Sequence, residues 1–169
     1  MLCQERIRHR YLPSLSSKAA DKGTFPMNAI PALNDMEVQA LSETLDDEYK
    51  SRETYAQVIR DFGEVRPFVN IVEAEARHVS ALLSLFGKHA IQVPSNRWVG
   101  KAPRFLTIHE ASVAAIQGEI ENIALYDRVL KSTRRTDILS VYRALRSASQ
   151  YRHLPAFQRC AQRSPRRGA

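Results

Sequence analysis

A glutamate and a histidine three residues apart, Glu75 and His78, interrupt the apolar stripe of the segment 68–87. Apolar residues recur in this segment three and four apart, which is the spacing of a helix with one face directed to a core. Glu75 and His78 lie on that face, one turn apart. A buried carboxylate is costly unless a cation or hydrogen bonds satisfy it. A metal ion bound by both side chains would do so; the alternative is a Glu at the edge of the stripe and a His bonded to a carbonyl.

Two further glutamates, Glu48 and Glu119, lie on the inward faces of two other predicted helices. A tyrosine follows each of them by seven residues, Tyr55 after Glu48 and Tyr126 after Glu119. The shared interval indicates that the two halves of the chain are diverged copies of one unit. Each tyrosine hydroxyl could donate to a carboxylate, or each ring could be a core aromatic with a solvated hydroxyl. Glu121 projects away from the inward face and is expected to be solvent-exposed.

The last predicted helix places His153 at the edge of its inward face, as the counterpart of His78. The residue three before it is Gln150 and the residue four before it is Ser149, so a second Glu-x-x-His is lacking. Pro155 is expected to kink or end the regular helix.

Four helices are predicted to position these side chains, over residues 35–62, 68–87, 107–131 and 136–160. Asn34 or Asp35 can cap the first helix, which Gly63 ends, and Thr107 can cap the third. The expected inward face of the third helix comprises Val113, Ile116, Ile120, Ile123 and Leu130. The second and third helices are separated by a long irregular connection, which lets the second hairpin lie turned over relative to the first.

Four short segments carry a family resemblance: DDEYKSRETY, NIVEAEARHVSALL, EIENIALYDRVL and RHLPAF. Over roughly residues 35–160 the sequence resembles the ferritin-like di-iron carboxylate superfamily. It is most similar to an uncharacterised bacterial ferritin-like group, a domain of unknown function, rather than to true ferritins. The resemblance implies an all-α, ferritin-like four-helix bundle with a long crossover between the second and third helices.

The resemblance also implies a metal centre in the bundle core. Its ligands would be Glu48, Glu75, His78, Glu119 and His153, with Tyr55, Tyr126 and Gln150 around them to orient the carboxylates. The expected metal is iron, as one or two ions, with manganese or zinc as alternatives. The implied activity is that of an oxidoreductase of ferroxidase or peroxidase type, which takes oxygen or peroxide and needs an unidentified electron donor. Three carboxylates supply a charge of −3 against the +4 of two ferrous ions. The site could therefore hold two irons, hold a single ion, or have lost the ability to bind metal. Whether the protein is an enzyme also stays open.

The competing interpretation is a metal-free four-helix interaction module. In that case a network of Glu, His and Tyr hydrogen bonds fills the core, and Arg52 or Arg152 supplies the counter-charge. Both arginines fall close to the inward stripes.

The net charge of +7 resides in the two ends of the chain. Residues 1–26 carry +3 and residues 155–169 carry +4, so the part between them is neutral. A neutral body offers no nucleic-acid face, and nucleic acid is not an expected partner. No apolar run approaches the roughly 18 residues of a membrane span. Two copies could pair through Trp98, or Trp98 could cover one end of the core.

The expected organisation is a basic, disordered N-terminal extension, the bundle, and a basic flexible tail, over residues 1–33, 34–160 and 161–169. The first 26 residues lack the apolar core of a secretory signal; they weakly resemble a transit peptide, or Met27 is the natural start. Cys3 and Cys160 form neither a metal-binding spacing nor a disulfide framework. The expected location is the cytoplasm.

Overall fold

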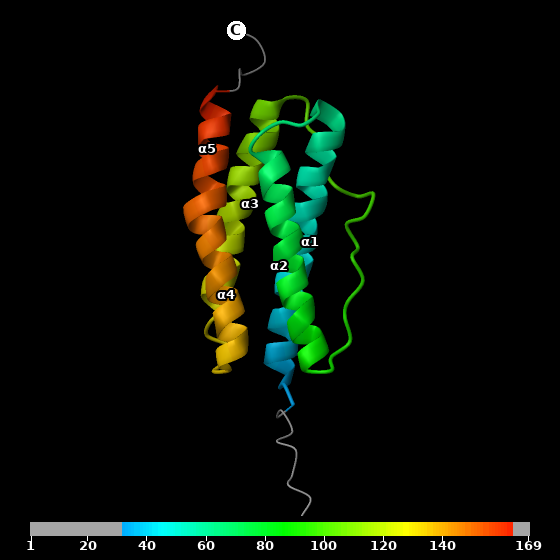
Figure 1. Cartoon of the computed structure of the whole chain (residues 1–169), viewed down its shortest axis with the longest axis vertical. Coiled ribbons are helices and arrows are strands. Elements are labelled where there is room, and N and C mark those ends of the chain that lie inside the picture. The colour runs from blue at the N-terminus through cyan, green and yellow to red at the C-terminus, as the bar shows by residue number, and fades with distance from the viewer. Residues whose placement is uncertain (1–31, 164–169) are drawn as a thin grey trace, which may run out of the picture. The chain divides into compact units, whose positions relative to one another are not determined.

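The computed structural model describes residues 32–163, and every regular element in this range is helical (Figure 1). The elements are α1 (Asp35–Phe62), α2 (Phe68–Lys88), α3 (Ile108–Val129), α4 (Thr136–Ala148), the π-helical turn η1 (Ser149–His153) and α5 (Leu154–Arg163). The all-α prediction is confirmed for these residues. None of these helices combines the length and apolar character that crossing a membrane requires. The predicted N-terminal extension lies almost wholly outside the described residues.

The helix ends follow the predicted capping residues. The Asn34 side chain accepts a hydrogen bond from the Glu37 amide at 2.9 Å, and the Glu37 carboxylate accepts one from the Asn34 amide at 3.0 Å. These reciprocal bonds form a capping box at the start of α1. Gly63 ends α1 with a φ of 82°, a left-handed value that favours glycine. Thr107 caps α3 by accepting from the Glu110 amide at 3.1 Å. At the other end of the chain, α5 continues to Arg163, past the expected boundary at residue 160.

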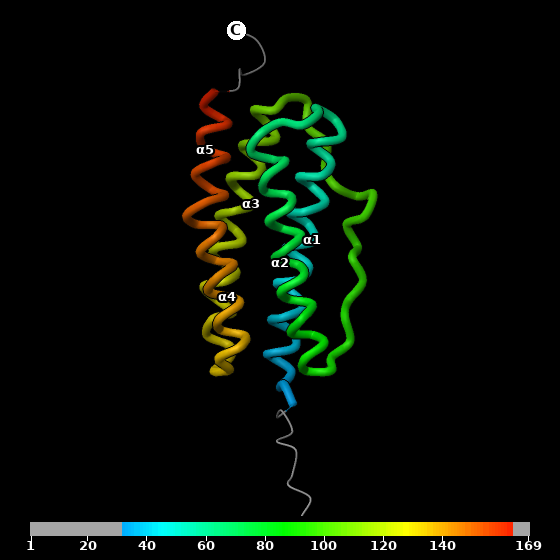
Figure 2. The backbone as a smooth tube through the Cα atoms, in the orientation of Figure 1, coloured from blue at the N-terminus to red at the C-terminus, as the bar shows by residue number. Residues whose placement is uncertain are grey.

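The long connection, residues 89–107, determines how the helices are directed. Figure 2 shows α2 running antiparallel to α1, the connection returning along α1, and α3 then running parallel to α2. The main helix contacts are between α1 and α2 and between α3 and α5. Within the connection, Trp98 packs against the core, and its indole N–H donates to the Asp46 carboxylate at 3.1 Å. Trp98 therefore covers the core of its own chain.

The buried face of α3 differs from the predicted one. Val113 and Ile120 are 48 % and 46 % exposed, so their placement in the core is wrong. The residues that α3 buries are mainly small or polar: Ala111, Ser112, Ala115, Glu119, Asn122, Tyr126 and Val129. Small side chains let the helix backbones approach closely, and Glu119, Asn122 and Tyr126 bond across the interior. Hydrophobic periodicity selected the branched residues and so rotated the predicted face.

The fourth helical segment passes through Pro155 by means of a π-helical turn. α-Helical bonding ends at Ala148, and the Leu154 amide then bonds to the Ser149 carbonyl five residues earlier. Proline has no N–H for an α-helical bond, and the wider turn accommodates it. The helical backbone then continues as α5, and His153 is buried with 3 % exposure. The expected position of His153 at the edge of the face is therefore corrected to the interior.

One carboxylate ties the end of α2 to the start of α4. Asp137 accepts from the Lys88 ammonium at 2.7 Å and from the His89 imidazole at 3.0 Å. Burial alone would raise the pKa of Asp137, but the hydrogen bonds from Lys88, the Ile138 amide and His89 together lower it to about 2. Such a lowered pKa stabilises the fold above about pH 4, and the stabilisation is lost as the pH falls towards 2.

We expect Asp137→Asn to lower the free energy of unfolding by about 1 kcal/mol at neutral pH, because Lys88 loses its charged partner. The loss is small because solvent reaches both side chains and weakens their ion pair. Urea unfolding of the variant and the parent between pH 7 and pH 3 measures the difference, which should shrink as the pH falls. Glu73→Gln, on an exposed face of α2, is the matched control. A difference that stays constant across this range would contradict the expectation.

Candidate metal centre

All five predicted metal ligands converge in the interior between the helices. Their side chains come from α1, α2, α3 and η1, and every one of the five residues is at most 7 % exposed. They are Glu48, Glu75, His78, Glu119 and His153. They form two groups of three, and in each group the candidate ligand atoms lie within 4.8 Å of one another.

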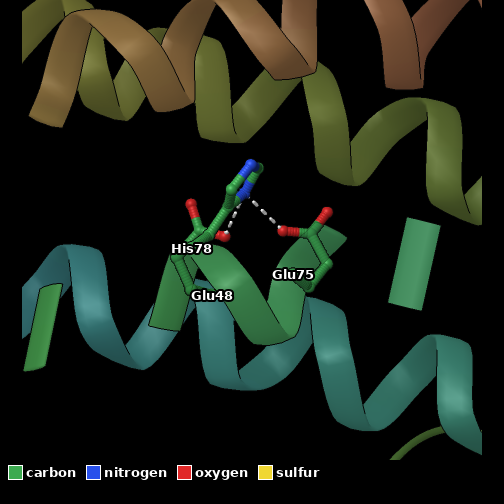
Figure 3. Close-up of side chains that lie close together, drawn as sticks. All are labelled: Glu48, Glu75 and His78. Atoms are coloured by element: carbon green, nitrogen blue, oxygen red, sulfur yellow. Dashed lines mark hydrogen bonds and ion pairs between the residues drawn. The ribbon is translucent and has the colours of Figure 1, made fainter. Parts of the chain in front are cut away.

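The first group, Glu48, Glu75 and His78, joins α1 to α2. The His78 Nδ1 lies 3.1 Å from Glu48 Oε2 and 2.8 Å from Glu75 Oε2. Figure 3 shows the imidazole between the two carboxylates, with all three side chains directed towards the other pair of helices. His78 is thus bonded to carboxylates and not to a backbone carbonyl. Glu75 is buried in the interior and does not lie at the edge of the stripe.

The second group, Glu75, Glu119 and His153, joins α2 to α3 and η1. The His153 Nδ1 lies 3.1 Å from Glu75 Oε1 and 3.6 Å from Glu119 Oε1. Although this nitrogen is buried, it makes no well-aligned hydrogen bond. Glu75 belongs to both groups, with one carboxylate oxygen facing each histidine. The two imidazole rings stack with centroids 5.3 Å apart.

The two predicted tyrosines bond to the carboxylates in a crossed pattern. The Tyr55 hydroxyl donates to Glu119 at 2.8 Å, and the Tyr126 hydroxyl donates to Glu48 at 2.7 Å. Because α1 and α3 run antiparallel, a residue seven positions after one glutamate lies level with the glutamate of the other helix. The repeat of Glu-x6-Tyr therefore produces two equivalent bonds between helices and none within a helix.

Sequence reasoning missed a polar link around Asn122. Its amide donates to Asp47 at 2.8 Å and to Glu48 at 3.2 Å, while its carbonyl oxygen accepts from Ser149 at 2.8 Å. The available signal was the position of Asn122, three residues after Glu119 and so on the same helix face. Burial, opposed by the bond from Asn122, raises the pKa of Asp47 to about 6.

Neither residue at the place of a fourth carboxylate joins the two groups. Gln150 was expected near the metal, but its side-chain oxygen accepts a hydrogen bond from Arg146. Arg146 in turn bonds to Asp127 at 2.6 Å, so this pair holds Gln150 to the side. The Ser149 hydroxyl donates its hydrogen bond to the Asn122 side chain and not to either group. The described residues therefore provide three carboxylates and two imidazoles.

No guanidinium fills the interior among residues 32–163. Arg52 bonds to its neighbour Glu53 at 2.9 Å and lies over the Tyr49 ring, and Arg152 is exposed. Within the described residues no lysine or arginine pairs with Glu48, Glu75 or Glu119. The counter-charge that the metal-free interpretation drew from Arg52 or Arg152 is therefore not provided by either residue.

Without a bound metal, protonated histidines balance the negative charge of the glutamates. Burial disfavours the charged form of His78, but Glu48 and Glu75 outweigh burial and raise its pKa to about 10. In the same way, Glu119 and Glu75 outweigh burial and raise the pKa of His153 to about 9. Burial and the charge of Glu75 raise the pKa of Glu48 to about 7. Both imidazoles are thus positively charged at neutral pH.

We expect the metal-free protein to lose on the order of 3 kcal/mol of stability between pH 7 and pH 10. A histidine whose pKa is raised on folding stabilises most fully below about pH 6.5, and the stabilisation is lost as the pH rises through 9 and 10. Urea unfolding in the presence of a chelator measures this loss. The double variant His78→Asn/His153→Asn should show a flatter profile than the parent. A parent profile as flat as that of the double variant would contradict the pKa shifts.

Comparisons of the chain with protein-family models, curated proteins and solved structures gave no match. The donors of the site are carboxylate oxygens and imidazole nitrogens, which suit iron, manganese and zinc.

Proposed function

We propose that this chain is a ferritin-like metal-binding protein with a carboxylate-bridged centre for two ions in its core. The observation that carries the proposal is the sharing of Glu75 between two buried donor groups, one with Glu48 and His78 and one with Glu119 and His153. Each helical segment contributes at least one donor. Ferritin-like four-helix bundles hold two metal ions with four glutamates and two histidines, and this chain supplies three of those glutamates and both histidines.

The helix directions support the ferritin-like part of the proposal. Residues 89–107 return along α1, so α2 and α3 run parallel and the second hairpin is turned over relative to the first. This inversion brings Tyr126 level with Glu48 and Tyr55 level with Glu119 on the antiparallel helices α1 and α3. The crossed bonds of Tyr55 and Tyr126 express the same pseudo-two-fold relation between the hairpins.

The donor set fits a pair of divalent ions. Glu48 and His78 would hold one ion, Glu119 and His153 the other, and Glu75 would lie between them. The buried His153 Nδ1 has no aligned hydrogen bond, as expected of an atom placed for a ligand. Iron is the first candidate, with manganese and zinc as alternatives. When bound, two ferrous ions would supply one-electron and two-electron redox chemistry with oxygen or peroxide.

The residues of the chain would prepare the site in three ways. The hydroxyls of Tyr55 and Tyr126 fix the orientation of Glu119 and Glu48 and leave their other lone pairs available. Asn122 holds Glu48 towards the interior. The protons of His78 and His153 must leave when metal binds, so affinity should rise with pH.

A metal-free interaction module is the second candidate, and the contacts of the two histidines favour it. His78 Nδ1 lies 2.8 Å from Glu75 and 3.1 Å from Glu48, and His153 Nδ1 lies 3.1 Å from Glu75, so imidazolium charges at these places would neutralise much of the charge of the glutamates. A closed network of this kind could serve only to fix the packing of the helices. In that case the site would not bind metal at physiological concentrations.

The test is the metal content of the full chain purified from cells supplied with iron. We expect about two iron ions per chain, lost on treatment with a chelator at acidic pH and regained at neutral pH. Reloaded protein should consume oxygen or peroxide when a reductant is supplied. Protein that takes up neither iron, manganese nor zinc, and whose stability does not respond to these ions, would favour the interaction module.

A further inference from the structure

A cavity of about 450 Å³ lies between α2 and the segment formed by α4, η1 and α5. Both candidate metal-binding histidines, His78 and His153, line this cavity. The cavity therefore reaches the proposed metal centre on its histidine side. Its volume is within the range of sites for small organic molecules.

The walls of the cavity are largely apolar, and several of its residues are small. Ile71 and Ala74 contribute from α2, Ala144 and Leu145 from α4, and Ala156 from α5. Three of these five side chains are alanines, so the space between the helices is left open where larger residues would fill it. An apolar molecule placed here would be removed from water without displacing any bonded polar side chain of the wall.

Two arginines, Arg77 on α2 and Arg152 on η1, also line the cavity and so contribute cations from both of its sides. Both are exposed, and neither makes a hydrogen bond or ion pair with any described residue. By contrast, Arg146 near the same segment is held by Asp127. Two guanidiniums that make no bond within residues 32–163, one on each side of the cavity, are suited to bind one carboxylate between them.

We propose that this cavity binds a small organic carboxylate with an apolar body, whose headgroup lies between Arg77 and Arg152 and whose body lies along the apolar wall, in the cavity that His78 and His153 also line. That the bound carboxylate is a substrate rests on the proposed metal function, because the molecule would lie next to the metal ligands. That the carboxylate binds at all depends only on the cavity, its apolar walls and its two arginines.

Octanoate is the probe, and 1-octanol and acetate are its matched controls. Octanol keeps the apolar body without the charge, and acetate keeps the charge without the body. Calorimetric titrations on metal-free and on iron-loaded full chain should show octanoate binding at least about tenfold tighter than either control. The double variant Arg77→Gln/Arg152→Gln should weaken octanoate binding about tenfold and leave octanol binding unchanged. Arg143→Gln, an exposed arginine of α4 that does not line the cavity, should have no effect.

A second variant tests whether octanoate binds in this cavity and leaves the charge of the protein unchanged. Ala144→Leu places a larger side chain at an exposed wall position, where it should fold normally and block octanoate. Iron loading without octanoate binding would overturn this inference and leave the metal site standing. Arginine-dependent octanoate binding in a protein that takes up no metal would support the binding site and overturn the proposed metal function. Octanoate binding that ignores both the arginine pair and Ala144→Leu would overturn the inference.

Discussion

Glu75→Gln is expected to abolish binding of both metal ions, because Glu75 is the one residue common to the two donor groups. In the proposed centre, replacing the shared Glu75 carboxylate by an amide would remove a negative charge and leave only a weaker neutral oxygen donor for both ions. We expect the affinity for ferrous iron to fall by about 100-fold or more, a larger effect than the 10-fold to 100-fold loss typical of residues that only support a ligand. Metal content after dialysis against a weak chelator measures the loss.

The variant needs a control for folding and a control for surface charge. Helical circular dichroism of Glu75→Gln shows whether the protein still folds, since His78 and His153 lose a charged partner. Glu73→Gln removes a carboxylate two residues away on an exposed position of α2 and should keep the full metal content. Folded Glu75→Gln protein that retains two ions per chain would be incompatible with a shared carboxylate.

Glu48→Gln and Glu119→Gln are expected to have separate effects, each removing one ion and leaving the other. Of the two candidate histidines, Glu48 pairs with His78, at 3.1 Å, and Glu119 pairs with His153, at 3.6 Å. Each variant should therefore retain about one ion per chain, and the double variant should retain none. Stoichiometry by elemental analysis, with the affinity of the remaining site measured by titration, tests this expectation.

Glu121→Gln is the matched control for Glu119→Gln, because Glu121 is two residues away and exposed on the same helix. It should bind two ions like the parent. If Glu48→Gln and Glu119→Gln each removed both ions together, the two donor groups would act as one inseparable site. If neither removed an ion, the bound metal would lie elsewhere.

The sequence predicted the helices well because their ends depend on local chemistry. Asn34, Gly63 and Thr107 carry their capping information in their own side chains or backbone freedom. The five candidate ligands were recognisable for a related reason. A charged residue within an apolar stripe is conspicuous, and the interval from Glu48 to Tyr55 repeats from Glu119 to Tyr126.

What the sequence could not reveal depends on the partner helix. The crossed tyrosine bonds require α1 and α3 to be antiparallel neighbours, which no local pattern states. The exposure of Val113 and Ile120 reflects a packing face made of small and polar residues. The burial of His153 depends on a π-helical turn that forms ahead of Pro155.

The direction of Gln150 also lay beyond sequence reasoning. Its position in the repeat suggested an amide near the metal, but the choice between the interior and Arg146 is decided by a bond to a neighbouring turn. Arg146 is itself oriented by Asp127 of α3. Such side-chain competition depends on tertiary contacts that no spacing rule contains.

The most direct test of a shared carboxylate centre is anomalous X-ray diffraction at the iron edge from crystals of the full chain loaded with ferrous iron. We predict two anomalous peaks within the helix interior, one next to Glu48 and His78 and one next to Glu119 and His153, with the Glu75 carboxylate between them. Crystals that show no peak there, with His78 and His153 still paired to the glutamates, would contradict the account.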